Sequence, residues 1–599
     1  MKYIYAKYLT FTSLLICFKN LKSFNLTFYY INSISLLVRI SSYIFNLNIN
    51  KYDYDLGKTK LDANNQFHLW SYLEVKCNEI SEEIYNKYKN QINYYTFISK
   101  KLNDYKYSLV IRKDIEIDIF DEVLLYFLAK TNISKKDKAI SKLFILSDSF
   151  FSKEINNYFT SYNIKFIENT KFIILIYSLR FIIFFIINII NFVPSLMLKY
   201  LRRKNEPKIA SKFELGILKK NFRDFYWINN FEKYKNKLIF FFDEKLDPNK
   251  FKIIRQNNSY FKKYQIKFIN LNILNIKLLF KTRIYSAFII INILKDLVSI
   301  NKLLLKSHNS FNTYLFLRKI VGIRIYQSFI INENVRVIFD YCDRFYDNVG
   351  VASDICEIKK IGFSWSFITQ ERAVTRHTQD YYFVWSNYEK KLLEKSNKIT
   401  KFEVCGCLFN EQNNIKFNEN ILNDTFGIID RSIGQKTSFS KKNYIKFFKQ
   451  LIEISKTQKL KFKIKPKNEN FKQIASKEFP EILNNNSFII YSHDEVISVL
   501  NNCKINISLG INSGGLISIL NKKETVFIDM ENNFEFIDKE FQYFLNKFNL
   551  IYEDIFYFFS KSKNINFKEC FNFFDKNFSS ENPKIIIENK VLNLFNTNK

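Results

Sequence analysis

From Lys237 onward, short apolar runs are separated by longer stretches in which apolar positions recur at helical spacing. Runs such as 238–242 and 335–339 contain no polar residue that would face water, apart from one arginine, as is typical of strands buried on both faces of a parallel sheet. The stretches between them, such as 314–332 and 442–457, have the length of helices. Because a parallel pair of strands needs a crossover, usually helical, the alternation predicts doubly wound α/β sheets.

The pattern is clearest in the last third of the chain. There the predicted strands are 402–405, 425–429, 460–465, 487–491, 505–509 and 525–528. Helices are predicted over 442–457, 495–501 and 513–521. We therefore predict two Rossmann-like domains facing a cleft, the first at 205–395 and the second at 396–560, followed by a C-terminal tail at 561–599.

The first part of the chain has a weaker pattern. Residues 1–170 are predicted to form a mixed, mostly helical extension of the first Rossmann-like domain. Its expected helices are 8–22, 81–105, 121–128 and 141–158, and its expected short strands are 27–31 and 165–167. The region between the extension and the first domain, 171–204, is a separate hydrophobic segment.

This hydrophobic segment predicts membrane association. Residues 181–198 carry no charge, whereas a membrane-spanning helix needs about 20 apolar residues and Arg180 interrupts the run. The segment ends in a basic cluster suited to anionic lipid headgroups, Lys199, Arg202, Arg203 and Lys204. Three interpretations stay open: a membrane-embedded helix that does not cross, a true span, and a buried helix. A span would separate 1–170 from 205–599, which is awkward if both build one catalytic unit.

Composition changes this picture little. The 599 residues include 91 Lys and Arg against 58 Asp and Glu, a net charge of +33. Lys, Asn, Ile, Phe and Tyr are abundant together, as in AT-rich genomes, and the lysines are spread along the chain, so we expect no nucleic-acid partner. Eight cysteines without a CxxC pair and only four histidines favour no metal, no cofactor and a reducing, cytoplasmic compartment.

Charged and small residues follow the predicted strands of the second domain. In open parallel sheets ligands bind beyond the carboxyl ends of the strands, so these residues should converge. The residues are Arg431, Lys465, His493, Asn512, Ser513, Gly514 and Gly515. Two cations, an imidazole and a glycine-containing helix start form an anion site suited to phosphate. Taken singly, Ser513 is also a helix N-cap candidate, Lys465 and His493 also fit surface positions, and Arg431 also fits a strand-end cap.

The order of these elements resembles the donor domain of GT-B glycosyltransferases, most nearly those of bacterial surface-polysaccharide biosynthesis. The Ser-Gly-Gly helix start is also similar to that of nucleotide-sugar 2-epimerases, and Arg431 with Lys436 matches an Arg-x4-Lys spacing that holds the donor diphosphate in retaining enzymes. The resemblance implies that Lys436 and the residues above bind a nucleotide-sugar. The sequence departs from the retaining pattern because its helix start has no acid, unless Glu524 substitutes.

A transferase that inverts the configuration of the transferred sugar needs a general base to take the proton of the acceptor hydroxyl. The candidates are Asp347 and His377 of the first domain, which alternatively are a turn residue and an exposed loop histidine. A basic pocket can neutralise a leaving diphosphate, so no metal is required.

These observations predict a glycosyltransferase on the cytoplasmic side of the inner membrane, moving a sugar from a nucleotide-sugar to a lipid-linked or surface glycan. A nucleotide-sugar epimerase or a polyol-phosphate transferase on the same fold is one alternative. A non-catalytic membrane-associated assembly protein is another. A nucleic-acid-binding protein is a third, and it predicts binding that falls steeply with salt.

Overall fold

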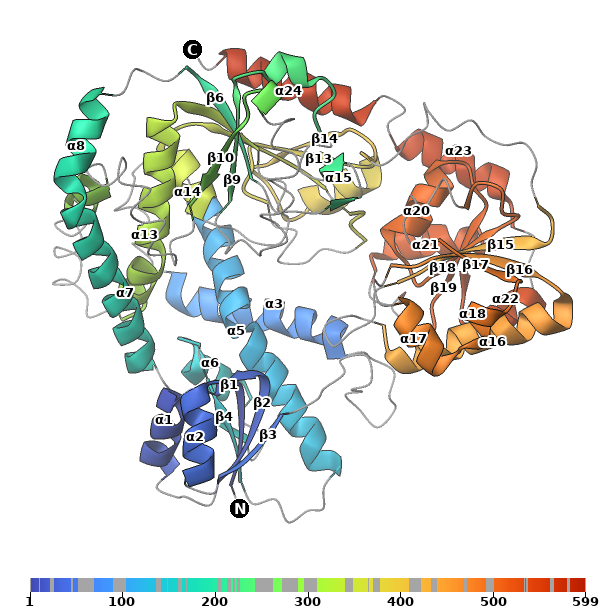
Figure 1. The fold of residues 1–599 in the computed structure, drawn as a ribbon, viewed down its shortest axis with the longest axis horizontal. Helices are drawn as coiled ribbons and strands as arrows, with labels where there is room; N and C mark the ends of the chain where they lie inside the picture. The colour runs from blue at the N-terminus through green and yellow to red at the C-terminus, as the bar shows by residue number, and fades with distance from the viewer. Residues whose placement is uncertain are drawn as a thin grey trace.

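The computed structural model shows three parallel sheets, each with helices packed on it (Figure 1). It describes all residues except 1, 10, 22–25, 45–46, 52–68, 90–103, 136–141, 148, 160–163, 168–169, 202–205, 213–216, 219–220, 223–226, 243–261, 272–288, 296–309, 340–347, 365, 370–376, 409–421, 432–438, 468–470, 492–499, 533, 535–536, 561–564, 579–581 and 598–599. The first sheet lies near the N-terminus, and the other two belong to the Rossmann-like domains.

The N-terminal domain is built on a five-stranded sheet of order β3-β2-β1-β4-β5, with all pairs parallel. Apolar side chains of α1 and α2 pack on one face of this sheet, and those of α3 and α5 pack on the other. The elements are β1 (Lys2–Leu9), α1 (Phe11–Leu21), β2 (Leu26–Ile34), α2 (Leu36–Ile44), β3 (Asn48–Lys51), α3 (Leu69–Tyr88), α5 (Asp104–Lys135), β4 (Lys142–Leu146), α6 (Ser152–Tyr158) and β5 (Ile164–Ile167).

This sheet corrects the expectation of a helical extension. Residues 2–9 form the central strand, and 141–158, expected as one helix, contains β4 before α6. Short apolar runs fit a buried strand and a buried helix equally well, and only pairing with distant strands separates the two. Helices over 11–21 and 121–128 and strands at 27–31 and 164–167 agree with the sequence pattern.

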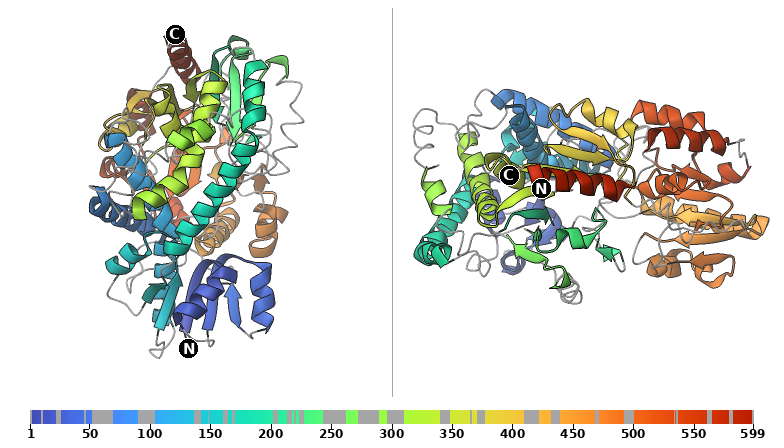
Figure 2. Two further views of the ribbon diagram at one scale, coloured as in Figure 1. Left: turned by 90° about the vertical axis from the view of Figure 1, so that its left-hand side faces the viewer. Right: turned by 90° about the horizontal axis from the view of Figure 1, so that it is seen from above.

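Two consecutive helices, α7 (Thr170–Ile190) and α8 (Phe192–Leu201), connect the N-terminal domain to the next sheet. They form the hydrophobic segment of the sequence. The inner side of α7 packs along α13 (Ser310–Asn332), with the rings of Phe181 and Phe316 5.8 Å apart. The two helices run along one side of the molecule (Figure 2, left).

The first Rossmann-like domain has a seven-stranded sheet of order β10-β9-β6-β11-β12-β13-β14. Its pairs are parallel, and the apolar runs at 238–242 and 335–339 are the buried strands that the pattern predicts. Within residues 272–305, the structure describes a helical stretch at 289–295. The remaining elements are β6 (Lys208–Lys212), β7 (Ile217–Leu218), β8 (Asn221–Phe222), a 3-10 helix (Phe231–Tyr234), β9 (Leu238–Phe242), β10 (Lys267–Asn270), β11 (Val335–Phe339), α14 (Asn348–Ile355), β12 (Lys359–Phe363), β13 (Tyr381–Val384), α15 (Asn387–Glu394) and β14 (Lys401–Val404).

The second Rossmann-like domain has a six-stranded parallel sheet of order β17-β16-β15-β18-β19-β20. A single large apolar cluster surrounds it and continues into α15 of the first domain. The elements are β15 (Thr425–Ile429), α16 (Lys441–Gln458), β16 (Lys461–Lys465), α17 (Phe471–Glu478), α18 (Glu481–Asn484), β17 (Phe488–Ile490), β18 (Asn506–Leu509), α20 (Ser513–Leu520), β19 (Thr525–Ile528), α21 (Lys539–Lys547), β20 (Ile551–Tyr552), α22 (Ile555–Ser560) and α23 (Phe567–Asn577).

The structure moves two expected boundaries. The strand β14 pairs with β13 at the edge of the first sheet, so the second domain begins after it and not at residue 396. Residues 561–599 are not a tail: α23 packs on the second domain, and α24 (Pro583–Thr597) returns to the first. The buried Glu588 carboxylate of α24 accepts the N–H groups of Asn229 and Asn230 at 3.1 and 3.0 Å. The chain therefore crosses between the two domains twice.

Candidate donor-binding site

The second sheet reverses its winding between β15 and β18. From β15 the chain adds β16 and β17 on one side, and from β18 it adds β19 and β20 on the other. The crevice at such a switch point, beyond the carboxyl ends of the strands, is where open α/β sheets bind ligands. Here Arg431 follows β15 and the 510–515 segment follows β18, so these predicted residues do come together.

Arg431 lies across the turn that ends β18. Its Nη1 is 3.4 Å from the carbonyl oxygen of Ile511, and its guanidinium lies 5.9 Å from the ring of Phe439. Gly510 has a φ of +69°, and a Cβ there would come within 2.1 Å of Arg431 Nη1. The turn thus requires glycine at position 510 for two reasons: the backbone there is left-handed, and the arginine occupies the space that a side chain would need.

The helix α20 begins directly after this turn. Its N-cap is Asn512, whose Oδ1 accepts the N–H of Gly515 at 3.1 Å, so Ser513 is the first helical residue and not the cap. A Cβ on Gly514 would lie 2.9 Å from Ile429, and one on Gly515 would lie 2.5 Å from Phe527, so both glycines let the helix pack against the sheet. The helix start directs its first N–H groups and positive dipole end toward the switch point.

Asp430 connects the loops after β15 and β16 by hydrogen bonds from both. The sequence pattern did not single out this residue. This buried carboxylate accepts the N–H of Arg431 at 2.7 Å and the N–H of Lys467 at 2.8 Å. Lys465, at the end of β16, donates from Nζ to the carbonyl of Pro466 at 3.2 Å and is half-buried. Asp430 therefore sets the backbone from which Arg431 projects, next to Lys465.

The start of α20 faces the first Rossmann-like domain. The Ser513 hydroxyl accepts the N–H of Phe367 at 3.2 Å, and nearby the N–H of Asp538 donates to the carbonyl of Thr369 at 2.8 Å. Phe367 and Thr369 follow β12, so they stand at the carboxyl edge of the first sheet. The carboxyl edges of the two sheets thus meet at Ser513.

A buried carboxylate, Glu389 of α15, holds the 367–369 segment in place. Its oxygens accept the N–H groups of Ile368 and Trp385, each at 2.7 Å. Burial raises the pKa of Glu389 to about 8, although its backbone N–H donors act in the opposite direction. The sequence signal that could have found it is the capping-box pattern from Ser386 to Glu389, since the Ser386 hydroxyl does accept the Glu389 N–H at 3.1 Å.

His377 lies elsewhere. It precedes β13, at the amino edge of the first sheet, and its ring stacks on Tyr382 with centroids 3.7 Å apart. Burial, with a smaller effect from the charge of Lys113, lowers the pKa of His377 well below its usual value. Its Nε2 has no hydrogen-bond partner among the residues that the structure describes. The structure therefore does not bring His377 to the carboxyl edge where an acceptor would meet the donor.

Several predicted residues lie outside the described residues. They are Asp347, Lys436, His493, Arg202, Arg203 and Lys204. For these residues the roles given above stay predictions. Within the described chain, no group of three or more His, Cys, Asp or Glu side chains is arranged to hold a metal ion.

The arrangement offers a ligand a guanidinium, the N–H groups of a helix start and a close backbone approach at Gly510, all at one switch point. This combination suits a phosphate or diphosphate. Two doubly wound domains with facing carboxyl edges form the GT-B-like fold that the sequence resemblance implies.

Comparison with known proteins adds a biological context. The family described as "Polysaccharide biosynthesis PFTS motif protein" matches residues 368–547, a range that includes Arg431, Lys465 and the 510–515 segment. No curated protein matches the chain.

Solved structures similar to the chain include glycosyltransferases and epimerases. The wall teichoic acid polymerase TagF is 11% identical, with 69% of this chain and 97% of TagF covered and a TM-score of 0.39. The UDP-GlcNAc 2-epimerase of Methanocaldococcus jannaschii is 11% identical, with 58% and 88% covered and a TM-score of 0.32. Arabidopsis thaliana UGT89C1, solved with UDP, is 9% identical, with 65% and 94% covered and a TM-score of 0.33.

Proposed function

We propose that this protein is a glycosyltransferase that moves a sugar from a nucleotide-sugar donor to a lipid-linked or surface glycan acceptor. The second Rossmann-like domain binds the donor, and the first binds the acceptor. The reaction takes place at the cytoplasmic side of the inner membrane. The family match over 368–547 supports a role in polysaccharide biosynthesis.

One observation carries the proposal. Arg431 lies against the Gly510 turn at the switch point of the second sheet, beside the start of α20 and facing the first domain. A guanidinium donates parallel hydrogen bonds that match phosphate oxygens, and helix N–H groups add donors of fixed direction. A site at the meeting of two domains can also bring a donor and a separate acceptor together.

The chemistry follows from these charges. As the bond between the sugar and the diphosphate breaks, negative charge builds on the leaving diphosphate. Arg431, Lys465 and the positive end of α20 stabilise that charge, because they are in place before the reaction. Removal of the acceptor proton is assigned to Asp347, which in the sequence lies between β11 and α14, immediately before α14 begins.

The test is a thermal-shift panel on the purified protein. Its ligands are UDP-, GDP-, dTDP- and CMP-sugars together with CDP-glycerol. A ligand at about 100 times its dissociation constant adds roughly 2.7 kcal/mol of stability, so binding is visible as a rise in Tm. We expect one nucleotide class to stabilise the wild type.

Two variants on one strand give the control. Lys465 lies at the carboxyl end of β16, whereas Lys461 lies at its amino end. The shift is expected to shrink in Lys465→Ala and to persist in Lys461→Ala. A folded protein that responds to none of the ligands contradicts the proposal and favours the non-catalytic assembly protein.

Product analysis then separates the enzyme classes of this fold. A glycosyltransferase releases a nucleotide and extends an added acceptor. An epimerase returns an altered nucleotide-sugar without an acceptor, and a polyol-phosphate transferase consumes CDP-glycerol and releases CMP.

A further inference from the structure

A helix on the surface of a water-soluble protein normally turns its apolar side chains inward and its polar side chains to solvent. In α7 and α8 this arrangement is reversed. The residues that face the protein include Phe184 and three polar side chains at helical spacing, Asn188, Asn191 and Ser195. The two asparagines donate to the carbonyls of residues four positions earlier, at 2.9 and 2.8 Å. The outward face instead carries large aliphatic side chains that are about half exposed, namely Leu175, Leu179, Ile182, Ile183, Ile186, Ile189, Ile190, Val193 and Leu196.

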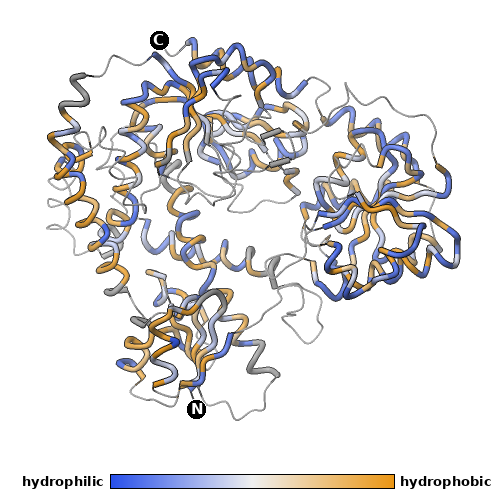
Figure 3. The backbone as a smooth tube through the Cα atoms, in the orientation of Figure 1, coloured by the Kyte–Doolittle hydropathy of each residue, from blue (hydrophilic) through white to orange (hydrophobic). Residues whose placement is uncertain are grey.

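A second helix of the same kind belongs to the N-terminal domain. In α2, Val38 and Ser41 are buried against the sheet. Its outward face carries Leu36, Leu37, Ile40, Tyr43 and Ile44, of which Tyr43 is 92% exposed. The α2 helix and the α7–α8 pair lie on the same side of the molecule (Figure 2, left), and both contain long apolar stretches (Figure 3). We call these two faces together the apolar side.

The charge of these segments is one-sided. Residues 1–52 contain six Lys or Arg and no Asp or Glu, and residues 169–205 again contain six Lys or Arg and no Asp or Glu. In the whole chain, acids make up 58 of 599 residues, so two acid-free stretches around the apolar helices stand out. Exposed Arg39 lies among the apolar residues of α2, and exposed Arg180 lies on α7. Apolar side chains flanked by cations alone complement an anionic lipid surface.

Packing of α7 excludes a crossing helix in this fold. By length and composition alone, residues 173–190 could span a membrane. However, α7 lies along α13, and α13 is fixed to α5 by charged pairs, with Lys319 Nζ 2.6 Å from Asp114 and Arg318 Nη1 2.9 Å from Asp118. Crossing would carry these ionic contacts into lipid, where they are costly. The sheets of β5 and β6, the strands before and after the pair, are also joined, because one apolar cluster includes side chains of the N-terminal domain together with those of α13 and α14.

We propose that the apolar side is a membrane-docking surface, in which α7, α8 and α2 lie flat in the headgroup region of an anionic bilayer without crossing it. This deepens the proposed function, since it brings the acceptor domain to the layer that holds a lipid-linked acceptor. The α7–α8 pair makes the larger contact, and α2 adds a second contact that fixes the tilt of the molecule.

The test is flotation of the full chain with two kinds of vesicle, phosphatidylcholine alone and equal parts of phosphatidylcholine and phosphatidylglycerol. We expect strong flotation only with the anionic vesicles. The double variant I183E/I186E on α7 should lower the partition coefficient at least roughly tenfold, and L37E/I44E on α2 should lower it by less. A matched control, Y543E/I585E, changes exposed apolar residues elsewhere and should float as the wild type does.

Three outcomes contradict the surface. One is flotation of I183E/I186E equal to that of the wild type at equal Tm. Another is that the wild type does not float and is a dimer, whereas I183E/I186E is a monomer. That result would assign the apolar face to contact with a second copy of the chain. The third concerns topology in sealed inverted membrane vesicles: tags at the two ends of the chain should both be open to added protease, whereas protection of one tag shows a span. The nucleotide thermal shift of I183E/I186E should remain, so that the docking surface and the donor site can fail separately.

Discussion

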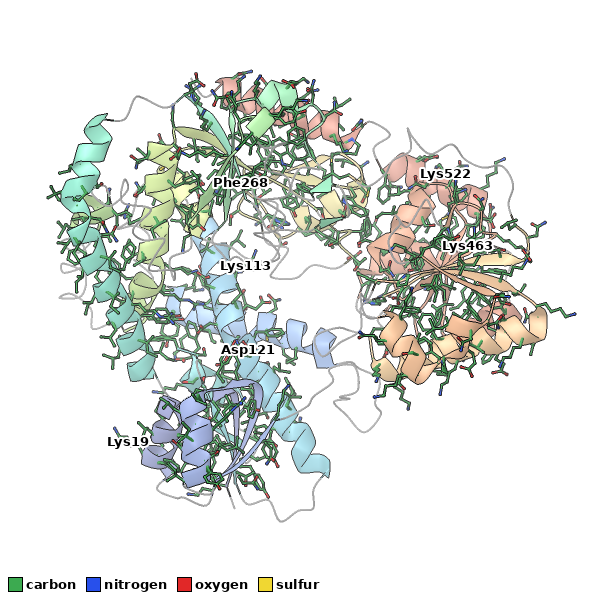
Figure 4. The ribbon with its side chains drawn as sticks, in the orientation of Figure 1. Lys19, Lys113, Asp121, Phe268, Lys463 and Lys522 are labelled. Atoms are coloured by element: carbon green, nitrogen blue, oxygen red, sulfur yellow. The ribbon has the colours of Figure 1, made fainter. Side chains whose placement is uncertain are left out.

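The N-terminal domain and the second Rossmann-like domain are both doubly wound parallel sheets, yet their switch points are used in opposite ways. In the N-terminal sheet the switch lies between β1 and β4, and the helix α5 covers it with carboxylates. Asp121 pairs with Lys7 of β1, and Asp118 accepts from the hydroxyl of Ser149 at 2.8 Å. Figure 4 shows Asp121 on α5 beside this sheet.

In the second domain the corresponding position is occupied by a guanidinium, a glycine turn and a helix start. Arg431 and Gly510 follow β15 and β18, whereas the carboxylates at the N-terminal switch point come from the helix α5. One topology thus holds a partly buried ionic junction in one domain and, in the other, the arrangement that we propose binds an anion. The comparison indicates that the fold provides the position, whereas the side chains placed there decide whether it is available to a ligand.

The largest expected effect comes from breaking the ionic junction at Asp118. Asp118 also accepts from Tyr314 Oη at 3.0 Å and from Arg318 Nη1 at 2.9 Å. Asp118→Ala leaves Arg318 without its carboxylate in a largely buried site, so we expect a loss of about 3 kcal/mol in the free energy of unfolding. Denaturant unfolding measures this loss.

The control for this change is Asp575→Ala, which removes an exposed partner of Lys522 and should cost less than about 1 kcal/mol. A loss from Asp118→Ala no larger than this would show that the junction does not hold the N-terminal domain to α13.

A pH effect of intermediate size is expected from Glu389. Its pKa in the folded protein, about 8, lies above the value of 4.5 of an unperturbed glutamate, so the folded state holds a proton that the unfolded state releases. Its contribution to stability is therefore complete below about pH 4.5 and is lost as the pH rises to about 8. The slope is at most roughly 1.4 kcal/mol per pH unit.

Urea unfolding of the wild type and of Glu389→Gln between pH 5 and 8 measures this effect. The variant cannot titrate at this position, so its stability should fall less steeply with pH. Parallel curves for the two proteins would show that Glu389 keeps its ordinary pKa.

We expect Gly510→Ala to cause a smaller change in stability and also a loss of nucleotide binding. The substitution adds a Cβ at a φ of +69° and displaces Arg431, at a cost of about 1–2 kcal/mol. The matched control is Gly406→Ala, at a glycine with a φ of 86° in the first domain. Both should lower Tm, but only Gly510→Ala should lose the nucleotide-induced shift. Loss of the shift in both would mean that strain alone, and not the position of Arg431, removes binding.

The smallest effect concerns the contact between the two domains. Ser513→Ala removes the acceptor for the Phe367 N–H and should lower the free energy of unfolding by about 1 kcal/mol. Ser476→Ala, on the exposed side of α17, should leave it unchanged within about 0.5 kcal/mol. Equal values for the two serine variants would show that the Ser513 contact adds nothing to the joining of the domains.

The sequence pattern predicted the second domain better than the N-terminal one for a physical reason. Strands such as 425–429 are mostly apolar and are followed directly by a charged residue, so both the strand and the position after it can be recognised. In β1, Tyr and Lys alternate with apolar residues, and its central place depends on pairing with β2 and β4 far along the chain. The assignment of β14 to the first sheet and the packing of α24 on the first domain depend on such distant contacts as well.

The same distinction applies to the site. Arg431 and the 510–515 turn were found because they directly follow strands. Asp430 and Glu389 were missed because their roles depend on the backbone N–H groups that they accept, which no spacing reveals. His377 was expected beside the acceptor, but it precedes its strand, so the direction of the chain places it at the opposite edge.

The central claim is that Arg431 belongs to a nucleotide-sugar site at this switch point. The most direct test is isothermal titration calorimetry of the wild type, Arg431→Ala and Lys461→Ala with the nucleotide-sugar that gives the largest thermal shift. Loss of a charge-assisted hydrogen bond to phosphate should weaken binding roughly tenfold to a hundredfold in Arg431→Ala, with the Tm of the free protein nearly unchanged, whereas Lys461→Ala should bind as the wild type does. Equal affinity of all three proteins would contradict the claim.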